Sequence, residues 1–574
     1  MSPYGPEGKE GAPQMKSARR MFWCAPLLVG VTWAMLATPS RAQGVAAKVK
    51  AAPAARVVPA KREVKKEPPP RPSPRVLTAS GVVDPHLKAA LSDAVNQPTL
   101  DNAEVGFLAV RLKDGQVMGE VGADQLINPA SNAKLVTSAA ALHTLHAEHR
   151  FKTEYFVNGT LKDGTLFGNL VVKGYGDPTI VSERLMRVAN ELYLFGVERI
   201  TGGVIVDGSW FDAVDEARGW EIEEAPDRAY AAAVTALAVN YNATSIYVRP
   251  TEPGKAAVVL VDPPSEQVVI EGSVMTEQLG SGVKVFSKKD DSDDGKQITL
   301  LTVEGSVGAR QSPFRTYRRV YAPLRHFGST LVYFLQQRGV KVQHRIMEGA
   351  VPDGSRLILV DRSPPLTEVI SDLNHYSNNI IAETLIKAMG AEVYGAPGTF
   401  DNGLKAARAF LEEQVGFEPG SYVFDNGSGL NDVNRFTPRQ LVKLLGFMAR
   451  DVEGGAEYTT SLGVAGTQGT IGFRMRDTPA ERRLRAKTGT LHGVSALSGY
   501  VADPAGDLLA FSVLTQNLQE GVSGAWQVQN SIGAALASNG AWHPAPEAVE
   551  AEGEQLSDAG GSVAKPEAAP GGAP

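Results

Sequence analysis

The sequence contains only one cysteine, Cys24, among its 574 residues. That cysteine lies in an apolar run near the N-terminus that we expect to be cleaved off, so the mature protein would have none. This absence excludes disulfide bonds, thiol catalysis and cysteine-ligated zinc. The formal net charge is only −6, which gives no global argument for binding nucleic acid. The sequence also lacks an internal repeat, and its length predicts two or three domains.

The first 42 residues have the pattern of an export signal. Basic residues between Lys16 and Arg20 precede an apolar run over 21–37, and small residues lead up to Ala42. This order predicts cleavage near Ala42 and a mature start near Gln43. The alternative is an uncleaved anchor, but the run is at the short limit for spanning a bilayer. We therefore expect no stable membrane span after cleavage.

Segments of low complexity flank a folded body. Residues 43–77 are rich in alanine, proline and basic side chains, and 544–574 in alanine, glycine, proline and glutamate. Such segments cannot bury enough apolar surface to order themselves, so we expect a disordered linker and a disordered tail. The basic residues of the linker could touch anionic polymers, although a solvated tether is the simpler interpretation.

Between these segments, the sequence predicts an α/β (α+β) body with an antiparallel sheet flanked by helices. Residues 78–150 begin with a hairpin over 105–121 and continue into a helix from Ser131 to about His149. Residues 151–318 alternate short β-rich runs with turns, which predicts mainly-β accessory domains inserted into the body. Residues 319–543 return to helices at 324–337, 366–389 and 525–537 and to strands at 483–490, 495–501 and 508–515.

The helix expected at Ser131 carries a serine and a lysine three positions apart. Residues three apart share a helix face, so the amine of Lys134 can reach the hydroxyl of Ser131. Serine needs a neighbouring base to become a nucleophile, and a lysine with a depressed pKa can be that base. The alternative without catalysis is a serine that caps the helix, followed by a solvated lysine. A second match at 281–284 precedes a strand-like run, and we interpret it as chance.

A second polar motif joins two predicted helices. Ser377 could relay a proton to a leaving amine, and Asn379 could hold a substrate amide. A register shifted by one residue would instead use the phenol of Tyr376, as in some β-lactamase-like esterases. The alternative without chemistry is a polar connection between helices.

A third motif lies in a predicted strand. Lys487 and Thr488 could bind a carboxylate, and Gly489 leaves room for a substrate backbone beside the strand. The edge of the strand at Thr490 can donate an N–H to an oxyanion. The alternative is an ordinary strand with a glycine bulge.

The order and spacing of the three motifs resemble the class C low-molecular-mass penicillin-binding proteins, which are D-alanyl-D-alanine carboxypeptidases/endopeptidases with accessory domains between the first two motifs. The resemblance covers about residues 80 to 540 and favours the Ser377 register. It also rests on five further segments, at 174–178, 206–212, 240–242, 427–430 and 434–438.

The resemblance implies a penicillin-binding-protein/β-lactamase-like transpeptidase fold and a serine hydrolase without metal or cofactor. Its partners would be peptidoglycan stem peptides and β-lactams, and its compartment the periplasm. The resemblance assigns catalytic roles to five residues and substrate binding to three. The catalytic residues are Ser131, Lys134, Ser377, Asn379 and Lys487, and the substrate-binding residues are Thr488, Gly489 and Thr490. The sequence leaves open whether the protein forms a homo-oligomer. The rivals are a β-lactamase or esterase, and a silent peptidoglycan-binding protein.

Three further features depart from these motifs. Asp432 stands where the family usually has arginine, which reverses the charge near the expected cleft. Histidines at 143, 146 and 149 recur every three residues but drift around a helix, so we do not expect a metal site. Asp207 and Asp212 could line a substrate groove, although capping of turns is the simpler expectation.

Overall fold

The computed structural model describes residues 72–542, apart from 292–294, 296 and 344. The expected leader, the tail and the linker up to residue 71 lie outside the described residues. The end of the linker is described, and it is bound to the body. The Arg75 guanidinium donates to the carbonyls of Leu100 (2.6 Å) and Ala103 (2.8 Å), and its backbone N–H donates to Asn96 Oδ1 (2.7 Å). The prediction that the disordered linker extends to residue 77 is therefore wrong at this end, because the guanidinium of Arg75 binds two loop carbonyls.

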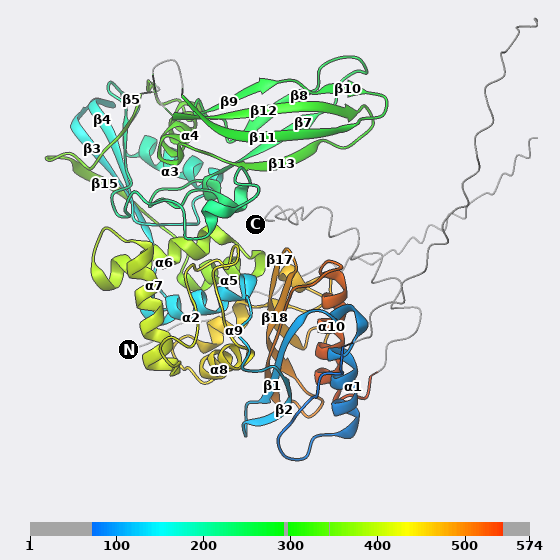
Figure 1. The fold of residues 1–574 in the computed structure, drawn as a ribbon. Coiled ribbons are helices and arrows are strands. Elements are labelled where there is room, and N and C mark those ends of the chain that lie inside the picture. The colour runs from blue at the N-terminus through cyan, green and yellow to red at the C-terminus, as the bar shows by residue number, and fades with distance from the viewer. Residues whose placement is uncertain (1–71, 292–294, 296, 344, 543–574) are drawn as a thin grey trace, which may run out of the picture. The chain divides into compact units, whose positions relative to one another are not determined.

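A six-stranded antiparallel sheet joins the two outer parts of the chain (Figure 1). The first and the last of these strands along the chain are neighbours in the sheet, and Val105 of one lies opposite Thr515 of the other. Successive side chains of a strand face opposite sides, so Phe107 and Leu108 belong to two different hydrophobic clusters. The strands, in spatial order, are β16 (Gly463–Val464), β17 (Leu484–Leu491), β18 (Val494–Ala502), β19 (Leu508–Gln516), β1 (Glu104–Arg111) and β2 (Gln116–Val121).

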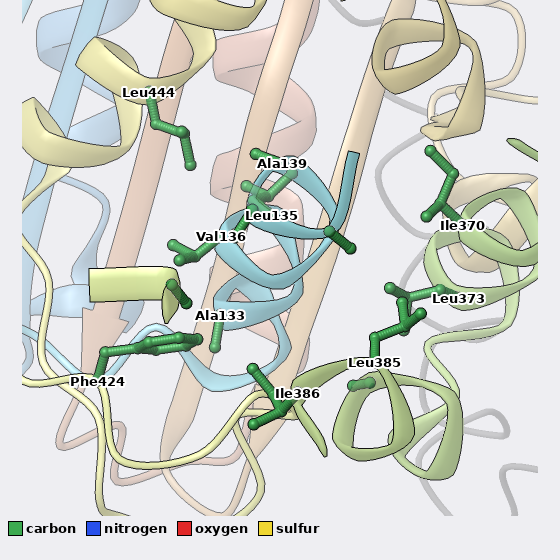
Figure 2. Packing of buried hydrophobic residues seen from close by; sticks show 14 of the residues in the cluster. Ala133, Leu135, Val136, Ala139, Ile370, Leu373, Leu385, Ile386, Phe424 and Leu444 are labelled. Carbon is green, nitrogen blue, oxygen red and sulfur yellow. The ribbon is translucent and has the colours of Figure 1, made fainter. Parts of the chain in front are cut away.

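Helices cover both faces of this sheet, as the alternation of its side chains requires. The helices α1 (Pro85–Val95) and α10 (Ser523–Ser538) pack together on one face. The other face carries a helical layer around α2 (Ala133–Leu145), and Figure 2 shows the apolar side chains packed about it. The remaining helices of the layer are α5 (Leu366–Tyr376), α6 (Asn379–Tyr394), α7 (Phe400–Ala409) with a π-helical extension (Phe410–Val415), α8 (Pro438–Met448) and α9 (Gly455–Ser461).

The inserted region contains two β-rich parts, each with its own hydrophobic core. The first is a mixed sheet of β14 (Ile346–Glu348), β6 (Val204–Asp207), β4 (Thr165–Gly174), β3 (Lys152–Lys162) and β15 (Arg356–Arg362), with β5 (Arg199–Ile200) beside β4. The helices α3 (Ser182–Leu194) and α4 (Pro323–Gln337) pack on it. The second consists of β7 (Ala243–Arg249), β8 (Val258–Asp262) and β13 (Phe314–Arg319), and of β9 (Val268–Gly272), β10 (Met275–Glu277), β11 (Gly282–Asp291) and β12 (Gln297–Gly308).

Strand pairing extends the inserted region beyond its expected end at residue 318. Strand β15 pairs with β3 so that Arg362 lies opposite Lys152, and β14 pairs with β6. The helix α4, expected in the catalytic part, buries Phe327 and Leu331 in the core of the first inserted sheet. We infer that the insertion runs from Lys152 to Arg362, because its last strand completes the sheet that its first strand begins.

The mixed architecture, an antiparallel sheet flanked by helices with a mainly-β insertion, agrees with the fold class that the sequence predicts. The helix α3 is the largest element that we did not expect within the insertion. Within the described part of the chain, no helix combines the length and the apolar character needed to cross a bilayer.

Candidate active site

Ser131 lies in a 3-10 turn (Ala130–Asn132) that leads directly into α2. The turn is entered through Ala130, whose backbone has a left-handed φ of 45°. The side-chain oxygen of the buried Asn128 accepts a hydrogen bond from the Ala130 N–H at 2.8 Å and so stabilises this bend. The first N–H groups of a helix have no partner within it, so Ser131 sits where a negative charge is favoured.

The amine of Lys134 lies beside the Ser131 hydroxyl. Its Nζ is 3.0 Å from Ser131 Oγ and 2.7 Å from Asn379 Oδ1, and it also donates to the Ser428 carbonyl. The side chain is fully buried. Burial lowers the pKa of Lys134 well below its ordinary value, and the nearby positive charge of Lys487 lowers it further. The neutral amine is thereby favoured, and only a neutral amine can take a proton from serine.

The second motif divides into two residues that face the site and one that caps a helix. Ser377 ends α5 in a left-handed conformation (φ 55°). The Asn378 side chain caps α6 by accepting from the N–H groups of Ile380 (2.9 Å) and Ile381 (3.1 Å). This cap directs Asn379, the first residue of α6, towards Lys134, and its amide nitrogen donates to the Tyr230 carbonyl at 3.1 Å.

Strand β17 brings a second buried lysine to the same place. Lys487 Nζ is 2.8 Å from Ser377 Oγ and 2.8 Å from the Thr488 carbonyl. Burial lowers the pKa of Lys487 to about 7. Lys487 therefore connects the two parts of the site, because it forms a hydrogen bond with Ser377 and its charge lowers the pKa of Lys134.

Gly489 allows β17 to lie against the turn that carries Ser131. A Cβ atom at Gly489 would be 2.7 Å from the Pro129 carbonyl oxygen and 3.1 Å from the Ala130 Cβ. On either side of this glycine, the Thr488 hydroxyl lies 2.6 Å from the Thr470 hydroxyl, and Thr490 is exposed. The third motif therefore provides a close approach of backbones, and an added methyl group would disturb it.

The structure thus brings all five predicted catalytic residues into two linked hydrogen-bonded groups, one on each lysine. The alternative register is less well placed. Tyr376 is 46% exposed, and it is the Ser377 hydroxyl that meets Lys487.

Two residues that sequence reasoning did not place in the site support it. The Asn132 amide, oriented to satisfy both neighbours, donates to the Lys487 carbonyl (2.8 Å) and accepts from Ser498 Oγ (2.7 Å). Glu383 is fully buried in α6 and accepts hydrogen bonds from a loop that contacts Lys134. The available signal was a polar residue inside an apolar helix, since such a residue must find a partner when buried.

The remaining candidates lie in other environments. Ser281 Oγ is 2.9 Å from Ser306 Oγ, and Lys284 is an exposed residue paired with Glu304 at 3.6 Å. The rings of His143 and His149 pack against Phe410 and Phe151, with centroids 5.0 and 4.8 Å apart.

The two aspartates of the inserted region have structural contacts. Asp207 follows the turn expectation, because it accepts from the N–H groups of Ser209 (2.9 Å) and Val351 (3.0 Å). Asp212 differs from the expectation of a turn cap and forms an ion pair with the buried Lys387 at 2.7 Å.

Asp432 is compensated by its neighbours. Its carboxylate pairs with Arg435 at 2.7 Å and accepts from Asn128 Nδ2 at 2.8 Å. The hydrogen bond from Arg435 holds the pKa of Asp432 below its usual range. The charge reversal predicted here is therefore partly neutralised, and the residue is connected through Asn128 to the bend before Ser131.

Comparisons with known proteins agree with this geometry. The chain is 33% identical over 492 residues to a D-alanyl-D-alanine carboxypeptidase of Actinomadura sp., covering 83% of this chain and 88% of that protein. It is 25% identical over 423 residues to the D-alanyl-D-alanine carboxypeptidase DacB of Haemophilus influenzae, covering 73% and 86%. The fold resembles the crystal structure of penicillin binding protein 4 (dacB) from Haemophilus influenzae, with a TM-score of 0.67 and 22% identity over 78% of this chain and 99% of that one. Residues 87–537 match the D-Ala-D-Ala carboxypeptidase 3 (S13) family, and the chain therefore belongs to this family of serine hydrolases.

Proposed function

We propose that Ser131 is the nucleophile of a D-alanyl-D-alanine carboxypeptidase that acts on peptidoglycan stem peptides or their D-alanyl cross-links. The observation that supports this most is the fully buried Lys134 amine, 3.0 Å from the Ser131 hydroxyl. A buried lysine beside a second cation is poised to be neutral and to act as a base.

In the first half of the reaction, Ser131 Oγ forms a bond to the carbonyl carbon between two D-alanines while Lys134 takes the hydroxyl proton. The negative charge that develops on the carbonyl oxygen faces the backbone N–H groups of Ser131 and Thr490. When the C–N bond breaks, the proton that Lys134 took passes through the Ser377 hydroxyl, which Lys487 contacts at 2.8 Å, to the leaving amine, so that Lys134 is neutral again.

In the second half, water attacks the acyl carbon and gives a proton to Lys134, the ester bond to Ser131 breaks, and Lys134 returns that proton to the Ser131 oxygen. Lys487 and Thr488 bind the terminal carboxylate of the substrate. Asn379 uses one N–H for the Tyr230 carbonyl, which leaves its second N–H for a substrate amide.

A β-lactam carries a strained amide that imitates the scissile bond, so it would acylate Ser131 and be released slowly. The substrate and the leader-like residues 16–42 support export to the periplasm, where peptidoglycan is accessible.

Labelling with a fluorescent penicillin tests the proposal. The full chain should be labelled, and Ser131→Ala should carry no label although it keeps its fold by circular dichroism. The same pair should differ in D-alanine release from a pentapeptide. Label retained in Ser131→Ala would refute the nucleophile, and an unlabelled folded wild type would favour a silent peptidoglycan-binding protein.

A further inference from the structure

The carboxylate of Glu383 is a buried charge that the proposed mechanism does not use. Glu383 lies one helical turn after Asn379 on α6 and is fully buried. Its Oε1 accepts from the Ser428 N–H at 2.7 Å, and its Oε2 accepts from the Gly427 N–H at 3.2 Å. Burial raises the pKa of Glu383, and the two N–H groups and the nearby Lys134 oppose this shift by stabilising the ionised carboxylate.

The loop that Glu383 holds is the one that contacts Lys134. The Ser428 carbonyl accepts a hydrogen bond from Lys134 Nζ. On the other side of the loop, Thr137 Oγ1 donates to the Gly427 carbonyl at 2.7 Å. The loop also lies close against the bend before Ser131, because a Cβ atom at Gly429 would be 1.9 Å from the Ala130 carbonyl oxygen. Glu383 and Thr137 therefore fix one peptide group from opposite sides.

We infer that Glu383 is a positioning residue for Lys134: it fixes the Gly427–Ser428 peptide, whose neighbouring carbonyl holds the lysine amine against the Ser131 hydroxyl. Glu383 itself touches neither Ser131 nor the expected substrate position. This inference rests on the proposed acyl-serine function and adds to it a residue that none of the three motifs contains.

The charge of Glu383 has a second consequence. The charged groups that face Lys134 are Lys487 from β17 and Glu383 from α6, and His375 from α5 faces Lys487. Burial and Lys487 lower the pKa of Lys134, and Glu383 opposes them. Removing the carboxylate removes the only opposing influence among these groups, so the pKa of Lys134 should fall further. The acidic limb of the acylation rate, where Lys134 becomes protonated, should then move to lower pH.

The decisive variant is Glu383→Gln, which keeps the shape but sets an amide N–H against a backbone N–H. One unsatisfied buried donor should slow acylation by a fluorescent penicillin by roughly 10- to 100-fold at the optimal pH. A loss of packing alone would slow the reaction without moving its acidic limb, so the shift to lower pH shows that the Glu383 carboxylate acts on Lys134. The matched control is Thr384→Val, a buried change of similar size on the next residue of α6, which should keep the wild-type rate and pH profile.

A second variant covers the case in which Glu383→Gln does not fold. Thr137→Val removes the opposite hydrogen bond to the same peptide and leaves the charge, so acylation should slow with an unmoved acidic limb. Wild-type acylation in Glu383→Gln, or slow acylation with an unmoved limb, would overturn the inference, as would a wild-type rate in Thr137→Val. If the wild-type chain itself is not acylated, the proposed function fails instead, so the two failures are distinguishable.

Discussion

The chain contains two Ser-x-x-Lys tetrapeptides, and only one of them forms an active site. At the start of α2, Ser131 and Lys134 share a helix face and their polar atoms are 3.0 Å apart. At the start of β11, Ser281 lies just before the strand and its hydroxyl is 2.9 Å from that of Ser306, whereas Lys284 lies within the strand and pairs with Glu304 at 3.6 Å. The same four-residue pattern therefore gives a proton-transfer pair at the start of a helix and two unrelated side chains at the start of a strand.

Lys134 and Lys284 also differ in burial. Lys134 is enclosed by α6, β17 and the loop at Ser428, whereas the Lys284 side chain is 71% exposed and pairs with Glu304 across a strand. A lysine in water is a charged donor, and a lysine that is buried near another cation can be a base. The Ser-x-x-Lys motif therefore carries chemistry only where the fold removes water from its lysine.

The largest expected difference concerns the two serines. Ser131→Ala should abolish penicillin acylation, because it removes the hydroxyl that lies 3.0 Å from the Lys134 amine. Ser281→Ala should leave the acylation rate unchanged. Gel fluorescence after labelling measures both, and a loss of label in Ser281→Ala would show that Ser281 also takes part in acylation.

Substitution of Lys134 should lower the acylation rate by orders of magnitude more than substitution of Lys284. A guanidinium stays protonated at any working pH and cannot act as a base. Lys134→Arg should therefore lower the acylation rate by roughly 10²- to 10⁴-fold, which is the usual contribution of a general base. Lys284→Arg should leave the acylation rate unchanged. Stopped-flow acylation kinetics compare them, and near-normal kinetics in Lys134→Arg would assign the base to another group.

Burial of lysine should also appear in the pH dependence of stability. The pKa of Lys487 is about 7 in the folded protein against an ordinary value of 10.5. Between these values the unfolded chain binds more protons, so the free energy of unfolding should rise with pH from about 7 to about 10.5. The cost of the buried charge is fully present below pH 7.

The matched variants are Lys487→Met and Lys284→Met. Urea unfolding at several pH values should show a flatter rise for Lys487→Met, and Lys284→Met should retain the slope of the wild type. An equal slope in Lys487→Met and wild type would show that Lys487 does not lose its proton in this range.

The smallest expected effect concerns the support of the bend before Ser131. Asp432→Asn keeps an acceptor for Asn128 but removes the exposed ion pair with Arg435. Exposed pairs contribute little, so the free energy of unfolding should fall by less than about 1 kcal/mol. Asn128→Ala, which leaves the Ala130 N–H without its acceptor, should slow acylation more than Asp432→Asn; the reverse order would remove Asn128 from this role.

The sequence predicts the site well where the chemistry is local. The Ser131–Lys134 spacing, the antiparallel strands around Lys487 and the helical connection at Ser377 all follow from short patterns. The sequence does not predict Glu383 as a partner of the Ser428 loop, because that contact joins segments distant along the chain through backbone groups. It also places the end of the insertion too early, since only pairing with β3 reveals that β15 belongs there. Arg75 escapes notice for the same reason, because its carbonyl partners have no signature of their own.

The pairing of β3 with β15 also bears on how the chain folds. Lys152 and Arg362 lie opposite each other, so the insertion starts and finishes at one place. Once this sheet has formed, the long stretch between Ser131 and Ser377 behaves as a short connection, and the entropy lost in bringing the catalytic segments together is correspondingly smaller. On the ribosome the insertion is complete before β17 emerges, so the nucleophile is made early but stays without Lys487 until synthesis is nearly finished.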